Sequence, residues 1–582
     1  MKYTYNIQKW LMLPLIVIAV SACDITLYPE DKETPESYFR DENDLQLFTN
    51  PFYTYLPTAD QIYADEADII INPMLKDAVS GQRIIPETSG NNITGWGWSL
   101  LRDVNYFLEN SGRCPDPDVV AHYNGIARFF RAYFYYCKVR TYGDVPWYDE
   151  VIGSADKELL NKPRDSRKYV MDKVLEDLDF AIKNIRTTDA PYRITKWAAM
   201  ALKSRVMLFE GTYRKYHNLG DWEECLQECV KVSEEFMKTS GYTLYQDGST
   251  PYQSLFNTLN ATATSKEIIL ARDYNNGVQV RHSVQQYVTS PTAGCGGVTR
   301  RLADAYLMRD GSKYTDQADY NKKSFVDECA NRDPRMAQTL YTPHSVINGK
   351  KTAAQNVKAA RLGYQLLKYY IDTKYDGFSE VDMPIFRTAE VYLNLAEAKA
   401  ELGTLTQTDL DNTVNKLRTR AGVLGKLDMA KANAAPDAWL QTEQWGYPNL
   451  AKNAGTYGNA ANLGVILEIR RERTVELVME GHRYWDIMRW KEGKVFERPF
   501  YGMYVPGPGK YDLNGDGTND LDTSKENLVL SEGDKGFCMM HKDLVRTWRE
   551  DRDYLYPIPT QDRILTQGAL VQNPGWDDKL VF

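Results

Sequence analysis

A run of oxygen-bearing side chains at alternate positions is the clearest candidate for chemistry in this sequence. The candidate ligands are Asp512, Asn514, Asp516, Thr518 and Asp520, with Gly517 in the middle. This spacing matches the first nine positions of a calcium loop, where oxygen atoms wrap a hard cation around a glycine turn. Thr518 would contribute its backbone carbonyl, Thr523 replaces the usual glutamate at position twelve, and Asp522 stands beside it. The sequence predicts a structural Ca²⁺ here; the alternative is a plain Asx/Gly turn.

A second dense group of charges lies at 468–490. It holds the acids Glu468, Glu472, Glu476, Glu480 and Asp486 among the arginines Arg470, Arg471, Arg473, Arg483 and Arg489. Carboxylates in this number could form an active site, but mixed charges three and four residues apart are typical of ion pairs between helices. We therefore predict a structural ion-pair lattice, and we interpret Arg387 with Glu390 and Glu397 in the same way.

Signatures of the common enzyme classes are absent from the sequence. It contains no HExxH or GxSxG motif. It also lacks a Walker A motif, because Gly509-Lys510 is followed by Tyr511, where a P-loop needs Ser or Thr. We therefore expect a protein that is not an enzyme. A glycosidase needs only two carboxylates about 5–9.5 Å apart, which no sequence pattern excludes. A secreted helical glycoside hydrolase is the alternative.

The segment 91–98 is the best candidate for a ligand-binding loop. It reads Asn91-Asn92-Ile93-Thr94-Gly95-Trp96-Gly97-Trp98. Two indoles can lie against the faces of sugar rings, and the amides of Asn91 and Asn92 can pair with hydroxyls. The alternative is that one or both of Trp96 and Trp98 are core residues at the start of the next helix.

The composition is acidic and rich in aromatic residues, with a formal net charge of −9 and 40 Tyr, 12 Trp and 18 Phe. An acidic body lacks the Lys/Arg excess that phosphate binding requires, so we expect no nucleic acid partner. Tyr and Trp at this density suit wet, specific contact surfaces, for which sugars are natural ligands. Cys225 and Cys229 have no nearby His or Cys to complete a metal site, so we interpret them as buried apolar residues.

Helical periodicity dominates the elements that must position these residues. Apolar stripes predict helices at 124–141, 167–186, 195–210, 383–402 and 466–490, with Ser166 and Thr195 as N-caps. Small residues on several faces allow close packing, as in tetratricopeptide-like hairpins. Long irregular stretches at 51–100, 242–300, 341–365, 425–462 and 500–540 separate the helical blocks. Loops of this length are typical of functional segments.

The N-terminus has the pattern of a lipoprotein signal. Lys2 and Lys9 precede an apolar run at 11–20, and small residues then lead to Cys23. We predict a signal peptide at 1–22, lipidation of Cys23 and a polar, lipidated tether over 23–45. The apolar run is shorter than the about 20 residues that a membrane-spanning helix needs. The alternative is an ordinary cleaved signal.

Five ordered motifs make the chain similar to the SusD/RagB family of outer-membrane, glycan-binding lipoproteins. They are Phe129-Phe130-Arg131-Ala132-Tyr133 with Tyr142-Gly143-Asp144-Val145-Pro146; Lys196 to Arg205 with Glu210-Gly211-Thr212; Phe386-Arg387 with Glu390 and Ala396-Glu397-Ala398; Glu472-Arg473 through Arg489-Trp490; and Tyr556-Pro557-Ile558-Pro559 with Gln572-Asn573-Pro574-Gly575-Trp576. The resemblance runs from Cys23 to Trp576, essentially the whole mature chain.

The resemblance implies a mostly α-helical fold: one body, 46–582, on a tetratricopeptide-like scaffold with ligand-binding loop insertions. It implies no catalysis and no organic cofactor. Family members bind oligosaccharide, or less often peptide, at the cell surface and pass it to a SusC-like TonB-dependent outer-membrane transporter. A mid-chain ligand loop of the family corresponds here to Arg272, Asp273, Tyr274 and Tyr287. Asp24 is the one residue that does not agree with an outer-membrane location. In some sorting systems, an aspartate at this position retains lipoproteins in the inner membrane.

Overall fold

The computed structural model of the protein describes residues 38–88, 90, 93–188 and 190–582. The predicted signal peptide, Cys23, Asn91 and Asn92 lie outside these residues. The helical body begins before residue 46, where the predicted tether was to end. Helix α3 (Glu42–Thr49) is capped by Asp41, and Leu45 is fully buried. The Phe39 and Phe107 ring centroids lie 5.9 Å apart, so Phe39 and Leu45 join the core from this segment.

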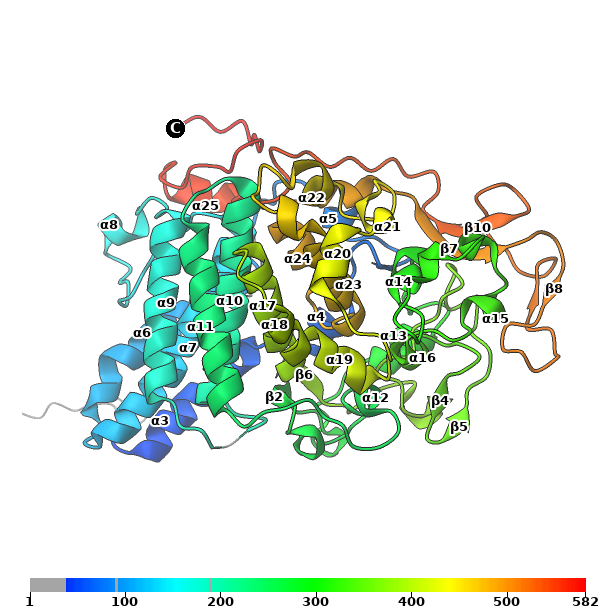
Figure 1. Cartoon of the computed structure of the whole chain (residues 1–582). Coiled ribbons are helices and arrows are strands. Elements are labelled where there is room, and N and C mark those ends of the chain that lie inside the picture. The colour runs from blue at the N-terminus through cyan, green and yellow to red at the C-terminus, as the bar shows by residue number, and fades with distance from the viewer. Residues whose placement is uncertain (1–37, 89, 91–92, 189) are drawn as a thin grey trace, which may run out of the picture.

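The left half of the molecule in Figure 1 is a stack of long antiparallel helices. Its members are α6 (Ser99–Asn110), α7 (Pro117–Tyr142), α9 (Arg167–Asn184), α10 (Lys196–His217), α11 (Trp222–Thr239) and α17 (Thr388–Glu401). Helix α7 packs on α9 and α10 packs on α11, while α11 and α10 also contact α17. The mostly α-helical, hairpin-stacked fold predicted from the sequence is confirmed.

Local signals explain why these helices form where they do. Ser166 accepts a hydrogen bond from the Tyr169 amide and Thr195 from the Ala198 amide, so both predicted N-caps are confirmed. Small residues then permit close packing. A Cβ atom built on Gly211 of α10 would lie 2.6 Å from the Leu226 side chain of α11, so these helices approach closely only because residue 211 has no side chain.

Shorter helices fill the second half of the chain and the connections. They are α4 (Ala59–Tyr63), α5 (Asp77–Ser80), α8 (Lys157–Leu160), α12 (Pro251–Ser254), α13 (Val284–Thr289), α14 (Arg300–Ala305), α15 (Phe325–Glu328), α16 (Pro334–Thr339), α18 (Gln407–Asn412), α19 (Val414–Ala421), α20 (Met429–Ala434), α21 (Ala438–Gln441), α22 (Pro448–Asn453), α23 (Leu463–Glu476), α24 (Arg483–Arg489) and α25 (Thr560–Leu565). None of the described helices is both long and apolar enough to cross a bilayer.

The strands of the described residues form two-stranded antiparallel sheets. Strand β1 (Ile70–Ile71) pairs with β3 (Gly297–Val298), β2 (Ile268–Arg272) with β6 (Met383–Arg387), β4 (Val346–Ile347) with β5 (Lys350–Lys351), β7 (Phe500–Val505) with β10 (Gly536–Met540), and β8 (Lys510–Tyr511) with β9 (Leu521–Asp522). The long irregular stretches predicted from the sequence therefore carry much of this local structure.

Two predicted helices are shorter than expected. The helix predicted at 383–402 begins at Thr388, because residues 383–387 form strand β6 against β2. The helix predicted at 466–490 is broken between Glu476 and Arg483. Within that break Met479 and Gly481 have positive φ angles of 60° and 76°, a conformation that no helix contains.

Buried ion pairs join these elements at the centre of the molecule. Arg387, at the end of β6, donates to Glu267 at 2.9 Å, to Glu476 at 2.7 Å and to Glu480 at 2.6 Å. Arg335 donates to Glu476 at 2.8 Å, and Arg420 binds the same carboxylate. The arginines hold the pKa of Glu476 well below its usual range even though burial alone would raise it. The predicted ion-pair lattice is present.

The lattice continues into α17 and α24. Arg489 of α24 binds both oxygens of Glu397 on α17, and it shares Asp486 with Arg473. Opposing its desolvation, Arg489 and Arg473 lower the pKa of Glu397 to about 2. Carboxylates held ionised in this way lack the raised pKa of a general acid.

Candidate functional site

The two tryptophans of the predicted ligand loop lie at the start of α6 but have different surroundings. Trp96 is buried, 3% exposed, and its ring makes edge contacts with Trp98 at 5.4 Å and with Tyr142 at 4.8 Å. Trp98 is only partly buried, and its ring contacts Phe134 at 5.5 Å and Tyr148 at 5.7 Å. Trp96 therefore behaves as a core anchor, and Trp98 is the more exposed of the two indoles at a pocket that both line.

This pocket, hereafter the Trp98 pocket, has a volume of about 480 Å³. Its lining is mainly aromatic and aliphatic, and includes Trp96, Trp98, Leu101, Tyr148, Ile152, Leu160, Leu565 and Leu570. Polar groups from Arg102, Asn105, Glu150, Lys162 and Asp562 complete it. The volume is in the range of small-molecule sites, and apolar walls with a few polar groups are their usual lining.

Some of the polar groups are already committed to the fold. Asn105 donates to the carbonyls of Tyr148 and Glu150, both at 3.1 Å, and Lys162 donates to the Trp147 carbonyl at 2.8 Å. They fix the segment 146–150 that forms one wall. The exposed side chains of Arg102 and Glu150 stand at the rim instead, where they can reach hydroxyl groups of a ligand.

A buried lysine lies behind Trp98. Lys138 of α7 is fully buried; its ammonium donates to the Gly95 carbonyl and stands 5.6 Å from the Trp98 ring centroid. Burial lowers the pKa of Lys138 to about 7. Through the Gly95 carbonyl and the indole, Lys138 holds the ligand loop against α7.

The mid-chain candidates lie elsewhere, around α4. Arg272 donates to the Leu56 carbonyl at 2.7 Å, and the Tyr274 hydroxyl accepts from the Ala59 amide at 2.9 Å. Asp273 is exposed. The Tyr287 hydroxyl donates to Asn72 at 2.9 Å. Arg272, Tyr274 and Tyr287 thus anchor the segment 56–72, and none of the four residues lines the Trp98 pocket.

The predicted calcium loop connects β8 to β9 at the right-hand edge of Figure 1. Asp512 accepts hydrogen bonds from the amides of Asn514 at 3.0 Å and of Gly517 at 2.7 Å, and Asp516 accepts from the Thr518 amide at 2.7 Å. The amide of Gly517 lowers the pKa of Asp512. Among the residues that the structure describes, no three His, Cys, Asp or Glu side chains are grouped to hold a metal ion. The loop is closed by its own hydrogen bonds, and the calcium ion stays a prediction.

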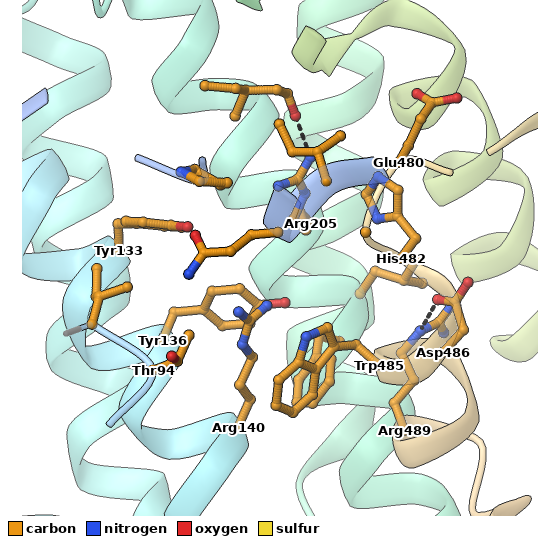
Figure 2. A pocket seen from close by; sticks show the side chains of 18 of the residues that line it. Thr94, Tyr133, Tyr136, Arg140, Arg205, Glu480, His482, Trp485, Asp486 and Arg489 are labelled. Carbon is orange, nitrogen blue, oxygen red and sulfur yellow. Dashed lines mark hydrogen bonds and ion pairs between the residues drawn. The ribbon is translucent and has the colours of Figure 1, made fainter. Parts of the chain in front are cut away.

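A second pocket, lined by charged side chains, was not anticipated from the sequence. It has a volume of about 250 Å³ and lies where α7, α10 and the segment 480–489 meet (Figure 2). Arg140, Arg205, Arg473 and Arg489 line it together with Glu480, Asp486, His482 and Trp485. We call it the Arg140 pocket. The only local signal was the spacing of Tyr136 and Arg140, four residues apart on one face of α7.

Comparisons with known proteins agree with this fold. Residues 259–576 match the model of the SusD family, and residues 71–208 match the model of a family described as starch-binding and associating with the outer membrane. SusD-like protein P2 of Formosa agariphila is 24% identical over 98% of this chain and 99% of its own. SusD-like protein P38 of the same organism is 22% identical over 86% of this chain and 95% of its own.

Solved structures show the same architecture. A SusD-like protein of Bacteroides fragilis superposes with a TM-score of 0.67 at 23% identity, over 94% of this chain and 100% of its own. A SusD-like carbohydrate-binding protein of the same species gives a TM-score of 0.65 at 19% identity, over 91% and 99%. Since the SusD family model covers more than half of the sequence, this chain belongs to the SusD family.

Proposed function

We propose that this protein is a non-enzymatic, surface-exposed lipoprotein of the outer membrane that captures oligosaccharide. Membership of the SusD family supports this role, as does the match of 71–208 to a family described as starch-binding. A lipid on Cys23 would hold the protein at the membrane. A SusC-like TonB-dependent transporter would take up the captured ligand.

The observation that carries the proposal is the composition of the Trp98 pocket. The Trp98 and Tyr148 rings provide apolar faces for the C–H groups of sugar rings. Arg102 and Glu150 stand at the rim of the pocket, where they can form hydrogen bonds with the sugar hydroxyls. Many weak contacts of this kind give modest affinity for a neutral sugar. Because the ligand carries no charge, its binding should change little with salt.

The experiment is a titration of the mature chain, 23–582, against a panel of neutral oligosaccharides by calorimetry. We expect Trp98→Ala to weaken binding at least tenfold. Since Trp98 also packs on Phe134, a second variant, Leu565→Glu, places a charge in the pocket from a side chain that is 71% exposed. Trp445→Ala, a partly buried tryptophan outside the pocket lining, serves as the control.

Three outcomes would overturn the proposal. Unchanged affinity in both pocket variants would remove the Trp98 pocket from ligand binding. Release of new reducing ends from any polysaccharide of the panel would favour the glycoside hydrolase instead. Binding of peptides but of no glycan would identify a peptide-binding member of the family, and a copurifying transporter would support the delivery step.

A further inference from the structure

The Arg140 pocket contains more positive than negative side chains, and nearly all of them are paired. Arg205 binds Glu390 at 2.7 Å, Arg473 binds Asp486 at 2.8 Å, and Arg489 binds Glu397. The pocket's own acids are satisfied in the same way, since Glu480 is held by Arg387 and by Lys368. These pairs leave little net charge on the walls that they form.

Arg140 is the exception among the buried cations; Lys76, which is exposed at the edge of the pocket, donates to the Ala64 carbonyl at 2.9 Å. No ion pair found among the described residues includes Arg140, and its Nε atom is buried without a hydrogen-bond acceptor. Its guanidinium lies 4.2 Å from the Trp485 ring centroid and 5.0 Å from that of Tyr136, so aromatic faces hold it from two elements. Figure 2 shows Arg140 and Trp485 beside one another in the pocket.

This arrangement has a physical cost that a ligand can relieve. A guanidinium has five N–H donors in one plane, and a buried donor without an acceptor destabilises the protein. Tyr136 is a neutral partner of the guanidinium, so the charge of Arg140 stays unbalanced and its Nε atom has no acceptor. The edge of a guanidinium matches the two oxygens of a carboxylate. A monoanion would balance the charge of this buried guanidinium.

The pocket also has a route of entry. A neighbouring pocket of about 630 Å³, hereafter the outer pocket, shares Gln61, Lys76, Gly481 and Trp485 with the Arg140 pocket. Its other walls include Tyr484 and Tyr556, and Lys76 stands exposed at the boundary. The outer pocket also has carboxylates, from Asp65, Glu66 and Asp77, so Lys76 is the positive charge that stands between these acids and Arg140.

We propose that the Arg140 pocket binds a small monocarboxylate, up to the size of a single sugar acid, with Arg140 as its charged partner. At about 250 Å³ the pocket is smaller than the roughly 300–1,000 Å³ of sites for drug-sized ligands, which sets the limit of one sugar unit. The site is separate from the Trp98 pocket, because the two share no lining residue. The acid can be a free molecule or the terminal residue of an oligosaccharide.

Calorimetry on the mature chain tests this with galacturonate and with galactose, which is its neutral counterpart. We expect galacturonate to bind and galactose to bind at least tenfold more weakly. Sodium acetate and sulfate extend the series: acetate should compete with galacturonate, whereas sulfate, which is divalent, should not. A trigalacturonide that binds at least as tightly as galacturonate would identify a glycan terminus as the source, and weaker binding would identify the free acid.

Variants then assign the binding to Arg140. Arg140→Met should weaken galacturonate binding at least tenfold, and Arg140→Lys, which keeps the charge but loses the planar fork, should weaken it less. The matched control is Arg193→Met, because Arg193 also stacks on an aromatic ring, that of Tyr53 at 4.5 Å. Trp98→Ala should leave galacturonate binding unchanged, which separates this site from the proposed glycan pocket.

Three results would overturn the proposal. They are no binding of galacturonate to the wild-type chain, equal binding of galactose, and undiminished binding in Arg140→Met. The first two need no variant, so a destabilised Arg140→Met protein does not prevent the test.

Discussion

Arg387 and Glu476 form a buried ion pair 2.7 Å long that joins strand β6 to helix α23. The same carboxylate also binds Arg335 and Arg420. Each arginine was desolvated on folding, and Glu476, with the other acids that these arginines bind, offsets that cost. The pair is therefore a point at which the charge lattice can be tested.

Glu476→Gln should destabilise the protein strongly, because it leaves three buried guanidinium groups without their shared charge. Loss of one partner from a buried pair typically costs about 3–5 kcal/mol. The free energy of unfolding in urea measures the effect. The control is Glu443→Gln, whose pair with Lys452 is exposed, and we expect no measurable change in its urea midpoint. Equal midpoints for both variants would contradict the lattice's structural role.

Asp65 should give the protein a stability that falls as the pH rises. Burial raises the pKa of Asp65 from 3.8 to about 7, and its Oδ2 atom has no hydrogen-bond partner. Between these two values the folded state binds the extra proton, so unfolding is favoured as the pH increases. The free-energy cost of burying the ionised Asp65 carboxylate is fully present above about pH 7 and absent below about pH 4.

Asp65→Asn should consequently raise the free energy of unfolding at pH 8, by up to about 4 kcal/mol for a pKa shift of roughly three units. The same substitution should have little effect at pH 4. Urea unfolding at both values measures the difference. A variant that is equally stable or less stable than the wild type at pH 8 would show that Asp65 is not the buried charge proposed.

We propose that the loop between β8 and β9 binds Ca²⁺ in a structural role. Elemental analysis of the purified protein should then find stoichiometric calcium, and EDTA should lower its Tm. Asp516→Ala should abolish this response, because Asp516 is the central carboxylate of the loop. The control Asp534→Ala alters an exposed acid of another turn and should retain it. A wild-type Tm that EDTA leaves unchanged would rule the ion out.

Cys23→Ala should separate folding from location. The variant should fold and bind glycan in vitro as the wild type does, because the proposed role of Cys23 is to carry the lipid. In cells it should leave the membrane fraction, and growth on the ligand should be lost. Asp24→Ser tests sorting by the same fractionation, and we expect it to remain in the outer membrane. Unchanged growth of the Cys23→Ala strain would show that the anchor is dispensable.

Helices could be predicted where the capping residue and the apolar spacing lay within one segment of the sequence. Ser166 and Thr195 cap their helices through residues three positions away, so the local pattern is complete. Residues 383–387 were misassigned as helix because their strand conformation depends on pairing with β2, a segment distant in sequence. The break at Met479 was missed although Gly481 is a local signal for it, because charged and apolar residues at helical spacing continue on both sides.

The candidate site shows the same limit. Trp98 was identified because aromatic and glycine residues gather in one loop, but a sequence could not tell that Trp96 would be buried and Trp98 would stay partly exposed. The Arg140 pocket combines side chains from α7, α10 and the segment 480–489, together with residues near α4. Only the fold shows that Arg140 has no carboxylate beside it while Arg205 and Arg473 do.

The Trp98 pocket takes its walls from segments that are synthesised at very different times. Trp98 and Leu101 belong to the region of α6, whereas Leu565 and Leu570 come from α25 and the residues after it. A nascent chain can thus stack its early helical hairpins long before this pocket exists. The pocket is complete only after residues 560–570 have packed beside the Trp98 region, so a ligand bound there would report that the chain has been synthesised almost to its last residue.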